Sequence, residues 1–193
     1  MAYTLYGSFP SPFVRRIRML LEGIPFEFKD MNIYETADAV ELNKINPVNQ
    51  IPVFQDGDRT IWDSRQIFYY LNQQHKLQNL DWDDENLLTV MEGAINAGVA
   101  LLLMKRSGIN VQEPYMYVQR QKDRIDSVLD YLKDYMNSER SKNWDFHAMT
   151  LYSFLDWAKF RGILSLESRP ECEEFLISHS HRLIVKQTAI PGN

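Results

Sequence analysis

The sequence predicts two parts of different fold class, an α/β domain at the N-terminus and an all-α domain after it. Up to residue 77, short strand-like runs alternate with amphipathic helical segments. From Asp81 onward the strand signals stop and long amphipathic segments take over. The stretch between these parts is polar and contains an acidic run, which is typical of a linker. The predicted limits are therefore 1–77 for the α/β domain, 78–84 for the linker and 85–193 for the helical domain.

The order of the N-terminal elements follows from hydrophobic periodicity and from turn residues. Gly23 stands where the first helix should stop, and Asp56-Gly57-Asp58 is a strong hairpin signal. The predicted elements are a strand at Tyr3–Tyr6, a helix at Pro12–Glu22, a strand at Phe26–Asp30, a helix around Ala37–Leu42, strands at Ile51–Gln55 and Thr60–Trp62, and a helix at Ser64–His75. This order is that of the thioredoxin-like fold. It differs from the long βαβαβ run of a dinucleotide-binding fold, and no GxGxxG motif is present.

The second part is predicted to consist of helices alone. Apolar residues recur at helical spacing over roughly Glu85–Arg106, Tyr115–Met136 and Phe146–Phe160, with shorter segments near the end.

Composition narrows the class of protein. Hydrophobic residues make up 45% and charged residues 24% of the 193 residues, which excludes collagen-like, disordered and membrane classes. The net charge of -5 is scattered and argues against a nucleic-acid surface, and the basic cluster Arg15, Arg16 and Arg18 is too short to change that. Cys172 is the only cysteine, which excludes disulfides, a CxxC redox pair and a cysteine zinc site.

The same survey predicts the compartment and the absence of a metal. No cluster of histidine and carboxylate ligands suggests a metal site. No basic, apolar leader opens the chain, and no apolar run approaches the ~18 residues of a membrane helix. A cytoplasmic protein without a membrane partner is expected.

The densest chemistry lies at the start of the first predicted helix. Pro12 suits the first turn of a helix, which makes Ser11 the natural N-cap. A hydroxyl there sits at the positive end of the helix dipole, where an anion is favoured. A hydrogen bond donated by that hydroxyl to a sulfur would stabilise the thiolate and so lower the pKa of the thiol. On spacing alone, a plain helix cap is the commoner interpretation.

The stretch Leu5–Phe28 resembles the opening of cytosolic glutathione S-transferases, particularly the serine-type, tau-like and bacterial classes. The resemblance implies the glutathione transferase architecture and assigns the contact with the glutathione sulfur to Ser11. Ser8 is the alternative, because other serine-type classes place the hydroxyl nearer the strand end. Tyr6 lies inside the strand and is interpreted as a packing residue. Phe13, within the motif, is placed among the glutathione-binding residues.

A second motif runs from Asn46-Pro47 to Pro52. Pro52 enters a predicted strand, where a proline has no N–H to donate to the sheet. A cis Ile51–Pro52 bond, which turns the backbone there, is therefore expected. An extended peptide could then pair with the backbone of Ile51, as in strand addition. The family resemblance assigns the cysteinyl part of glutathione to this place, and it brings Gln50 to the glycyl end. A plain loop is an equally good interpretation of Gln50 alone.

A third motif, Asp63-Ser64, opens the helix that ends at His75. Either residue can cap that helix, whose start suits a carboxylate while a nearby acid suits an ammonium. The γ-glutamyl group of glutathione carries both charges. The resemblance therefore assigns this group to Asp63 and Ser64.

In the helical part the resemblance is looser. Family members begin a central helix with a capping box; here Asp145 can cap, but Ala148 cannot return the bond. A small hydrophobic electrophile is expected between the halves, against Phe9, Phe13, Met104 and Tyr115, although such residues belong more often to a core. The family resemblance also implies a homodimer.

The resulting hypothesis is a glutathione transferase whose co-substrate glutathione attacks an apolar electrophile or reduces a hydroperoxide. The alternative is a non-catalytic glutathione-binding or interaction protein with the same fold. A thiol reductase would need a cysteine where Ser8 and Ser11 stand. The histidines match no catalytic triad and are expected at the surface or at helix ends: His75, His147, His179 and His181.

Overall fold

The structure, a computed structural model, describes residues 3–192, which fall into two units. The N-terminal unit runs to Asn79 and also takes in the chain from Leu183 onward. The helical unit is Leu80–Arg182. The end of the chain therefore belongs with the N-terminal unit, which the sequence-based limit of 85–193 for the helical domain does not anticipate.

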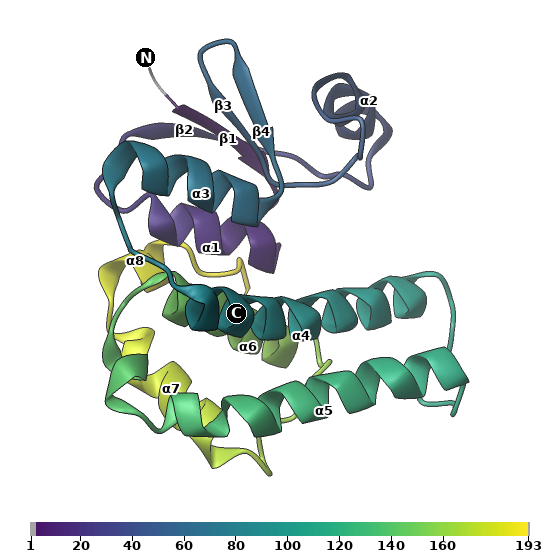
Figure 1. The fold of residues 1–193 in the computed structure, drawn as a ribbon. Coiled ribbons are helices and arrows are strands. Elements are labelled where there is room, and N and C mark those ends of the chain that lie inside the picture. The colour runs from purple at the N-terminus through teal and green to yellow at the C-terminus, as the bar shows by residue number, and fades with distance from the viewer. Residues whose placement is uncertain (1–2, 193) are drawn as a thin grey trace. The chain divides into compact units, whose positions relative to one another are not determined.

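A four-stranded sheet forms the centre of the N-terminal unit, in the order β2-β1-β3-β4 (Figure 1). Its strands are β1 (Tyr3–Gly7), β2 (Phe26–Asp30), β3 (Val53–Asp56) and β4 (Arg59–Trp62). β1 and β2 are parallel, whereas β3 is antiparallel to both β1 and β4. One row of the sheet pairs Tyr6 with Val53 and Val53 with Trp62.

Helices cover both faces of this sheet (Figure 1). α1 (Pro12–Leu20) and α3 (Ser64–His75) lie on one side, and α2 (Thr36–Ile45) lies on the other. Because side chains alternate along a strand, Tyr6 and Val53 point to the α2 side, where they form a small core with Leu42. The opposite side holds Leu5 and Phe54, both without exposed surface.

The element order predicted for this unit is confirmed, and the differences lie at element ends. α1 stops at Leu20 rather than Glu22, and Gly23 follows in a left-handed conformation with φ 77°. β3 begins at Val53 rather than Ile51, because Pro52 has no N–H to add to the sheet ladder.

The helical unit contains four long helices and a short 3-10 turn within the part of the chain that is described. They are α4 (Trp82–Arg106), α5 (Met116–Met136), η1 (Glu139–Lys142), α6 (Phe146–Phe160) and α7 (Pro170–Ser180). α6 is buried over most of its length and supplies the core, with Trp157 and Phe154 lying against Gly98 of α4. α4 begins inside the predicted linker because Asp81 and Asp84 form a reciprocal capping box.

Two of the four histidines are buried, and both lie at helix ends, one of the two kinds of position expected for them. His147, in the first turn of α6, has no exposed surface, and His179, in the last turn of α7, is 2% exposed. His179 Nε2 lies 2.9 Å from the Ser141 carbonyl oxygen, and Arg182 Nε donates to its Nδ1 over 3.3 Å. These two bonds define a neutral imidazole with its proton on Nε2.

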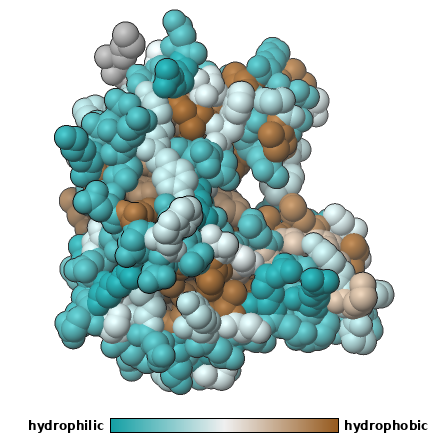
Figure 2. Space-filling model, in the orientation of Figure 1, coloured by the Kyte–Doolittle hydropathy of each residue, from teal (hydrophilic) through white to brown (hydrophobic). Residues whose placement is uncertain are grey.

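The surface is mostly hydrophilic on the face drawn in Figure 2, where apolar residues form groups separated by polar ones. Among residues 3–192, α4 alone has the length and composition that would allow a helix to cross a membrane. Its most apolar 18-residue window is 44% buried, and the core helix of a soluble protein meets the same criterion.

Candidate functional site

The start of α1 has the geometry expected of a helix cap. Ser11 is the N-cap, in an extended conformation, and its Oγ accepts the Val14 N–H over 3.3 Å. The Ser11 N–H donates to the Ser8 carbonyl oxygen over 3.1 Å, which closes a tight loop between β1 and α1. Since Ser11 Oγ accepts the Val14 N–H, its own O–H remains free to donate to another group.

A glycine brings α1 close to the strand before it. A Cβ at Gly7 would lie 2.4 Å from a methyl carbon of Val14, closer than packed atoms tolerate. Gly7 is therefore required for the first turn of α1 to rest on the end of β1. This approach sets the position of Ser8 and Ser11, both of which are half-buried.

The loop before β3 carries the second motif. The Ile51–Pro52 bond is cis, as the sequence predicts. Ile51 lies outside the paired register, which begins at Val53, so sheet pairing does not use its backbone groups. Asn46, 2% exposed, holds the loop: its side chain accepts the Val48 N–H over 2.9 Å and donates to the Gln50 carbonyl oxygen over 2.6 Å.

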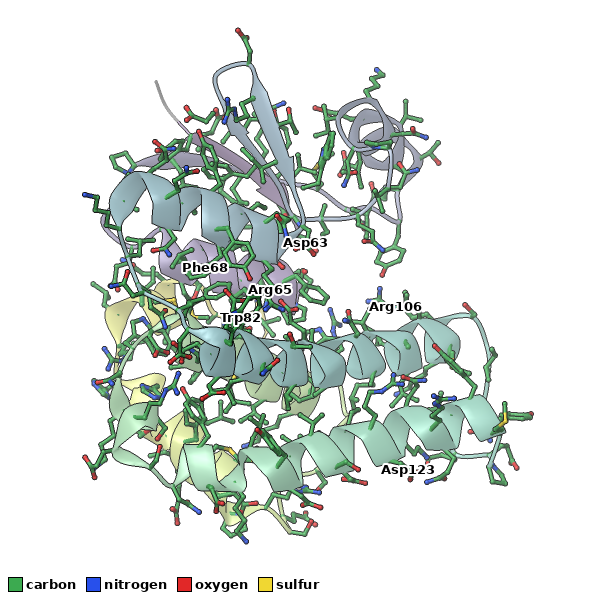
Figure 3. The ribbon with its side chains drawn as sticks, in the orientation of Figure 1. Asp63, Arg65, Phe68, Trp82, Arg106 and Asp123 are labelled. Carbon is green, nitrogen blue, oxygen red and sulfur yellow. The ribbon has the colours of Figure 1, made fainter. Side chains whose placement is uncertain are left out.

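The third motif opens α3, where Asp63 stands between β4 and the first helical turn (Figure 3). Asp63 is the N-cap, and its Oδ1 accepts both the Arg65 and the Gln66 N–H groups, over 2.8 and 3.2 Å. Its φ of 68° is costly for a residue other than glycine, and such strain collects at binding sites. Asp63 is exposed, and no described residue donates to Oδ2, which leaves that oxygen for a cation.

Ser64 has a partner that the sequence does not reveal. It is 1% exposed, and its Oγ accepts from Arg16 Nη2 over 2.6 Å. This bond joins α1 to α3 beneath Asp63 and leaves the Ser64 hydroxyl proton free to donate. Because Ser64 is buried, a ligand at this helix start would meet Asp63 first.

The three motifs meet at one end of the sheet. The row Tyr6, Val53 and Trp62 crosses β1, β3 and β4 just before each motif. The loop with Ser8 and Ser11 follows β1, the Ile51–Pro52 bond precedes β3, and Asp63 follows β4. Three segments far apart in the sequence thus offer a hydroxyl, free backbone groups and a carboxylate along one edge.

The remaining site residues predicted from the sequence lie in separate places. Phe13 is half-buried on α1, with the Arg16 guanidinium 5.4 Å from its ring centroid. The Phe9 ring packs edge-on against Phe28 at 5.0 Å, within the N-terminal unit. Met104 and Tyr115 belong to the helical unit. That Met104 and Tyr115 line one electrophile pocket together with Phe9 stays a prediction.

The basic cluster of α1 proves to be internal. Arg15, Arg16 and Arg18 are 2%, 0% and 8% exposed. The apolar positions Val14 and Ile17 mark one buried face of α1, but nothing in the periodicity indicates that its other faces are covered as well. Within residues 3–192 no group of three or more His, Cys, Asp or Glu side chains is placed to hold a metal ion.

Comparison with known proteins shows what the chain is similar to. Residues 1–73 match the family model described as the glutathione S-transferase N-terminal domain. The N-terminal part of the chain is therefore similar to the N-terminal domain of glutathione S-transferases. Glutathione S-transferase 1 of Manduca sexta is 35% identical over 75 residues, which are 37% of this chain and 35% of that protein. The match thus spans about a third of the length of this curated relative.

Solved structures of the glutathione S-transferase family share the fold over nearly the whole chain. A glutathione S-transferase from Methylobacillus flagellatus with bound glutathione has a TM-score of 0.84 at 18% identity, over 97% of this chain and 99% of that one. Another from Methylobacterium radiotolerans, in complex with glutathione sulfonate, has a TM-score of 0.83 at 19% identity, over 99% and 95%. The predicted combination of a thioredoxin-like domain with helices is confirmed.

Proposed function

We propose that this protein is a glutathione transferase in which Ser11 stabilises the thiolate of bound glutathione. The observation that carries the proposal is the cap of α1. Ser11 Oγ takes its hydrogen bond from Val14, so the hydroxyl proton is available to a sulfur at the positive end of the helix. Ser8, at the end of β1, offers its backbone carbonyl to the Ser11 N–H and has no such cap.

The rest of the tripeptide has a partner for each of its polar groups. The exposed Asp63 carboxylate can pair with the γ-glutamyl ammonium, and the start of α3, with the Ser64 hydroxyl over Arg16, favours the γ-glutamyl carboxylate. The backbone of Ile51 can pair with the cysteinyl residue as an added strand would, with Gln50 toward the glycyl end. In the proposed binding mode the sulfur lies toward the loop between β1 and α1.

Catalysis then consists of thiol activation and positioning. A hydrogen bond to the charged form lowers the thiol pKa, and each unit corresponds to about 1.4 kcal/mol. The thiolate attacks a small apolar electrophile, and a carbon–sulfur bond forms as the leaving group departs with its bonding electrons. With a hydroperoxide, the thiolate takes the terminal oxygen and releases the alcohol, and the resulting glutathione sulfenic acid reacts with a second glutathione to give glutathione disulfide and water. We include in the proposal Phe13 as a glutathione contact, a homodimeric assembly and a cytoplasmic location, all of which the family resemblance supports.

The test compares Ser11→Ala with Ser8→Ala. The pKa of bound glutathione is followed by the ultraviolet absorbance of its thiolate, together with kcat and KM for an aryl halide. Ser11→Ala should raise the thiol pKa by about one unit and lower kcat at neutral pH about tenfold, with KM for glutathione little changed. Ser8→Ala should change the thiolate fraction of bound glutathione and kcat by less than about twofold.

Three other outcomes are informative. If Ser8→Ala produces the loss and Ser11→Ala does not, Ser8 is the activating hydroxyl. Calorimetric binding of glutathione without turnover of any electrophile would favour the non-catalytic binding protein. No calorimetric affinity at millimolar glutathione would reject the proposal altogether.

A further inference from the structure

The end of the described chain returns to the N-terminal unit. We call Leu183–Gly192 the C-terminal segment; it starts with the short helix α8 (Leu183–Gln187). Its inward side chains are at most 8% exposed: Ile184, Val185, Thr188 and Ile190. The segment is therefore packed rather than loose, and its contacts assign it to the unit that carries the candidate site.

Two arginines of α1 bind the last carbonyl groups of α8. Arg15 Nη2 donates to the Val185 oxygen and Arg18 Nη2 donates to the Gln187 oxygen, each over 3.3 Å. The final carbonyls of a helix have no partner within it, and its dipole favours a cation at that end. α1 thus caps the C-terminal segment through side chains that start in the helix of Ser11.

Arg18 also contacts the loop that contains both candidate serines. Its guanidinium carbon lies 4.7 Å from the ring centroid of Phe9 and 4.9 Å from that of Phe28, within range of a cation-π interaction. The backbone of Phe9 has a further partner, since its N–H donates to Asp30 Oδ1 over 3.3 Å. One side chain therefore touches the Ser8–Ser11 loop and the C-terminal segment together.

This arrangement is costly for a guanidinium. Arg18 is 8% exposed, and its Nη1 is buried without a hydrogen-bond partner. Burial and the charge of Arg15 lower the pKa of Arg18 to about 10, against the opposing charge of Asp30, so the side chain still carries its charge at neutral pH. An apolar side chain would fill such a place at a lower desolvation cost, but it could neither donate to the Gln187 carbonyl nor make a cation-π contact with the Phe9 ring.

We propose that Arg18 is a positioning residue through which the C-terminal segment holds the Ser8–Ser11 loop and thereby sets how strongly that loop stabilises a bound thiolate. The last step rests on the proposed function. The mechanical step, from the C-terminal segment through Arg18 to the loop, does not depend on it.

The mechanical step is tested by hydrogen exchange in the protein without glutathione. The reporters are the amides of Phe9, Ser11 and Val14, whose hydrogen bonds define the loop. Arg18→Met should speed the exchange of these amides about tenfold. Ile190→Val, a separate variant in the C-terminal segment, should speed it about threefold. Lys186→Ala, on the exposed side of α8, is the matched control and should change nothing.

A double variant identifies Arg18 as the connection. If the C-terminal segment acts through Arg18, Ile190→Val should have little further effect on the three amides once Arg18 is methionine. Additive effects would overturn this route. Arg18→Lys, which keeps the charge and one carbonyl bond, should recover part of the protection and serves in place of Arg18→Met if that variant does not fold.

The chemical step is tested on the glutathione complex of the same variants. Arg18→Met should raise the bound thiol pKa by about half a unit, which leaves about threefold less thiolate below that pKa, with KM for glutathione unchanged. A change in KM alone would show a merely structural role and overturn the proposal, as would unchanged exchange in both single variants. If wild-type protein binds no glutathione, the proposed function fails, and the exchange data still decide the mechanical step.

Discussion

At the scale of single residues, the candidate site consists of side chains that hydrogen-bond within the fold and keep a second donor or acceptor. Ser11 Oγ caps α1 and keeps its proton for donation. Asp63 Oδ1 accepts two N–H groups, which leaves Oδ2 as an acceptor. Ser64 Oγ accepts from Arg16 and keeps its own proton. In each case one hydrogen-bonding function is used by the fold and another remains for a ligand. The candidate site is therefore preorganised, which would lower the ordering cost of binding a ligand there.

Gly7 offers a prediction at this scale. Gly7→Ala should force Val14 and the start of α1 away from β1, because a Cβ would lie 2.4 Å from a Val14 methyl carbon. We expect a loss of about 1–3 kcal/mol in unfolding free energy, together with a fall in glutathione-dependent turnover. Denaturant titration and kcat measure the two effects.

Gly93→Ala provides the control for this prediction. Gly93 lies inside α4 and a Cβ there would meet nothing within 4 Å. This substitution should stabilise the protein by roughly 0.5–1 kcal/mol, since it removes backbone freedom from the unfolded chain. A Gly7→Ala variant as stable and active as wild type would contradict the close approach.

At the scale of elements, helix starts decide where the helical unit begins and how its core helix is set. Asp81 and Asp84 cap α4 reciprocally, whereas α6 has half of that device: Asp145 Oδ1 accepts the Ala148 N–H over 2.9 Å and nothing returns from position 148. The predicted cap at Asp145 is confirmed. A helix as fully buried as α6 gains most of its stability from packing, so one cap is sufficient.

Asp145→Ala should cost about 1 kcal/mol of stability in the helical unit, because the first turn of α6 loses the acceptor for one of its free N–H groups. Urea unfolding followed by circular dichroism measures this loss. Asp145→Asn keeps an acceptor at the same place and should lose much less. Equal losses in the two variants would show that charge rather than capping matters there.

At the scale of the whole molecule, pH acts through a buried imidazole. Burial lowers the pKa of His179, partly offset by its bond to the Ser141 carbonyl oxygen; the charges of Arg182 and His181 lower the pKa further, and Asp145 opposes them. The unfolded state therefore binds a proton more readily than the folded state. The stabilisation is present above the usual pKa near 6.5 and is lost as pH falls below it.

Unfolding free energy should accordingly decrease below about pH 6.5, with a slope that does not exceed about 1.4 kcal/mol per pH unit from this group. Chemical denaturation at several pH values measures the slope. His179→Gln, which can still donate to the Ser141 carbonyl, should flatten the profile. His181→Gln, at the exposed C-cap of the same helix, is the control and should keep most of the slope.

Local sequence patterns determined the elements and the motifs of this protein. Hydrophobic periodicity predicted α3 and α6 to their end residues, Pro12 predicted the cap at Ser11, and Pro52 predicted the cis bond. Each of these features depends on residues within a few positions of one another. Backbone sterics and side-chain direction are therefore enough to predict them.

Only the tertiary structure decided which distant residues share a place. It buried Arg16 against Ser64, placed Arg18 between the Phe9 loop and α8, and returned the C-terminal segment to the N-terminal unit. An arginine looks the same in a sequence whether water or protein surrounds it. Its burial depends on what packs against the far sides of its helix, and those partners lie 48 to 170 residues away along the chain.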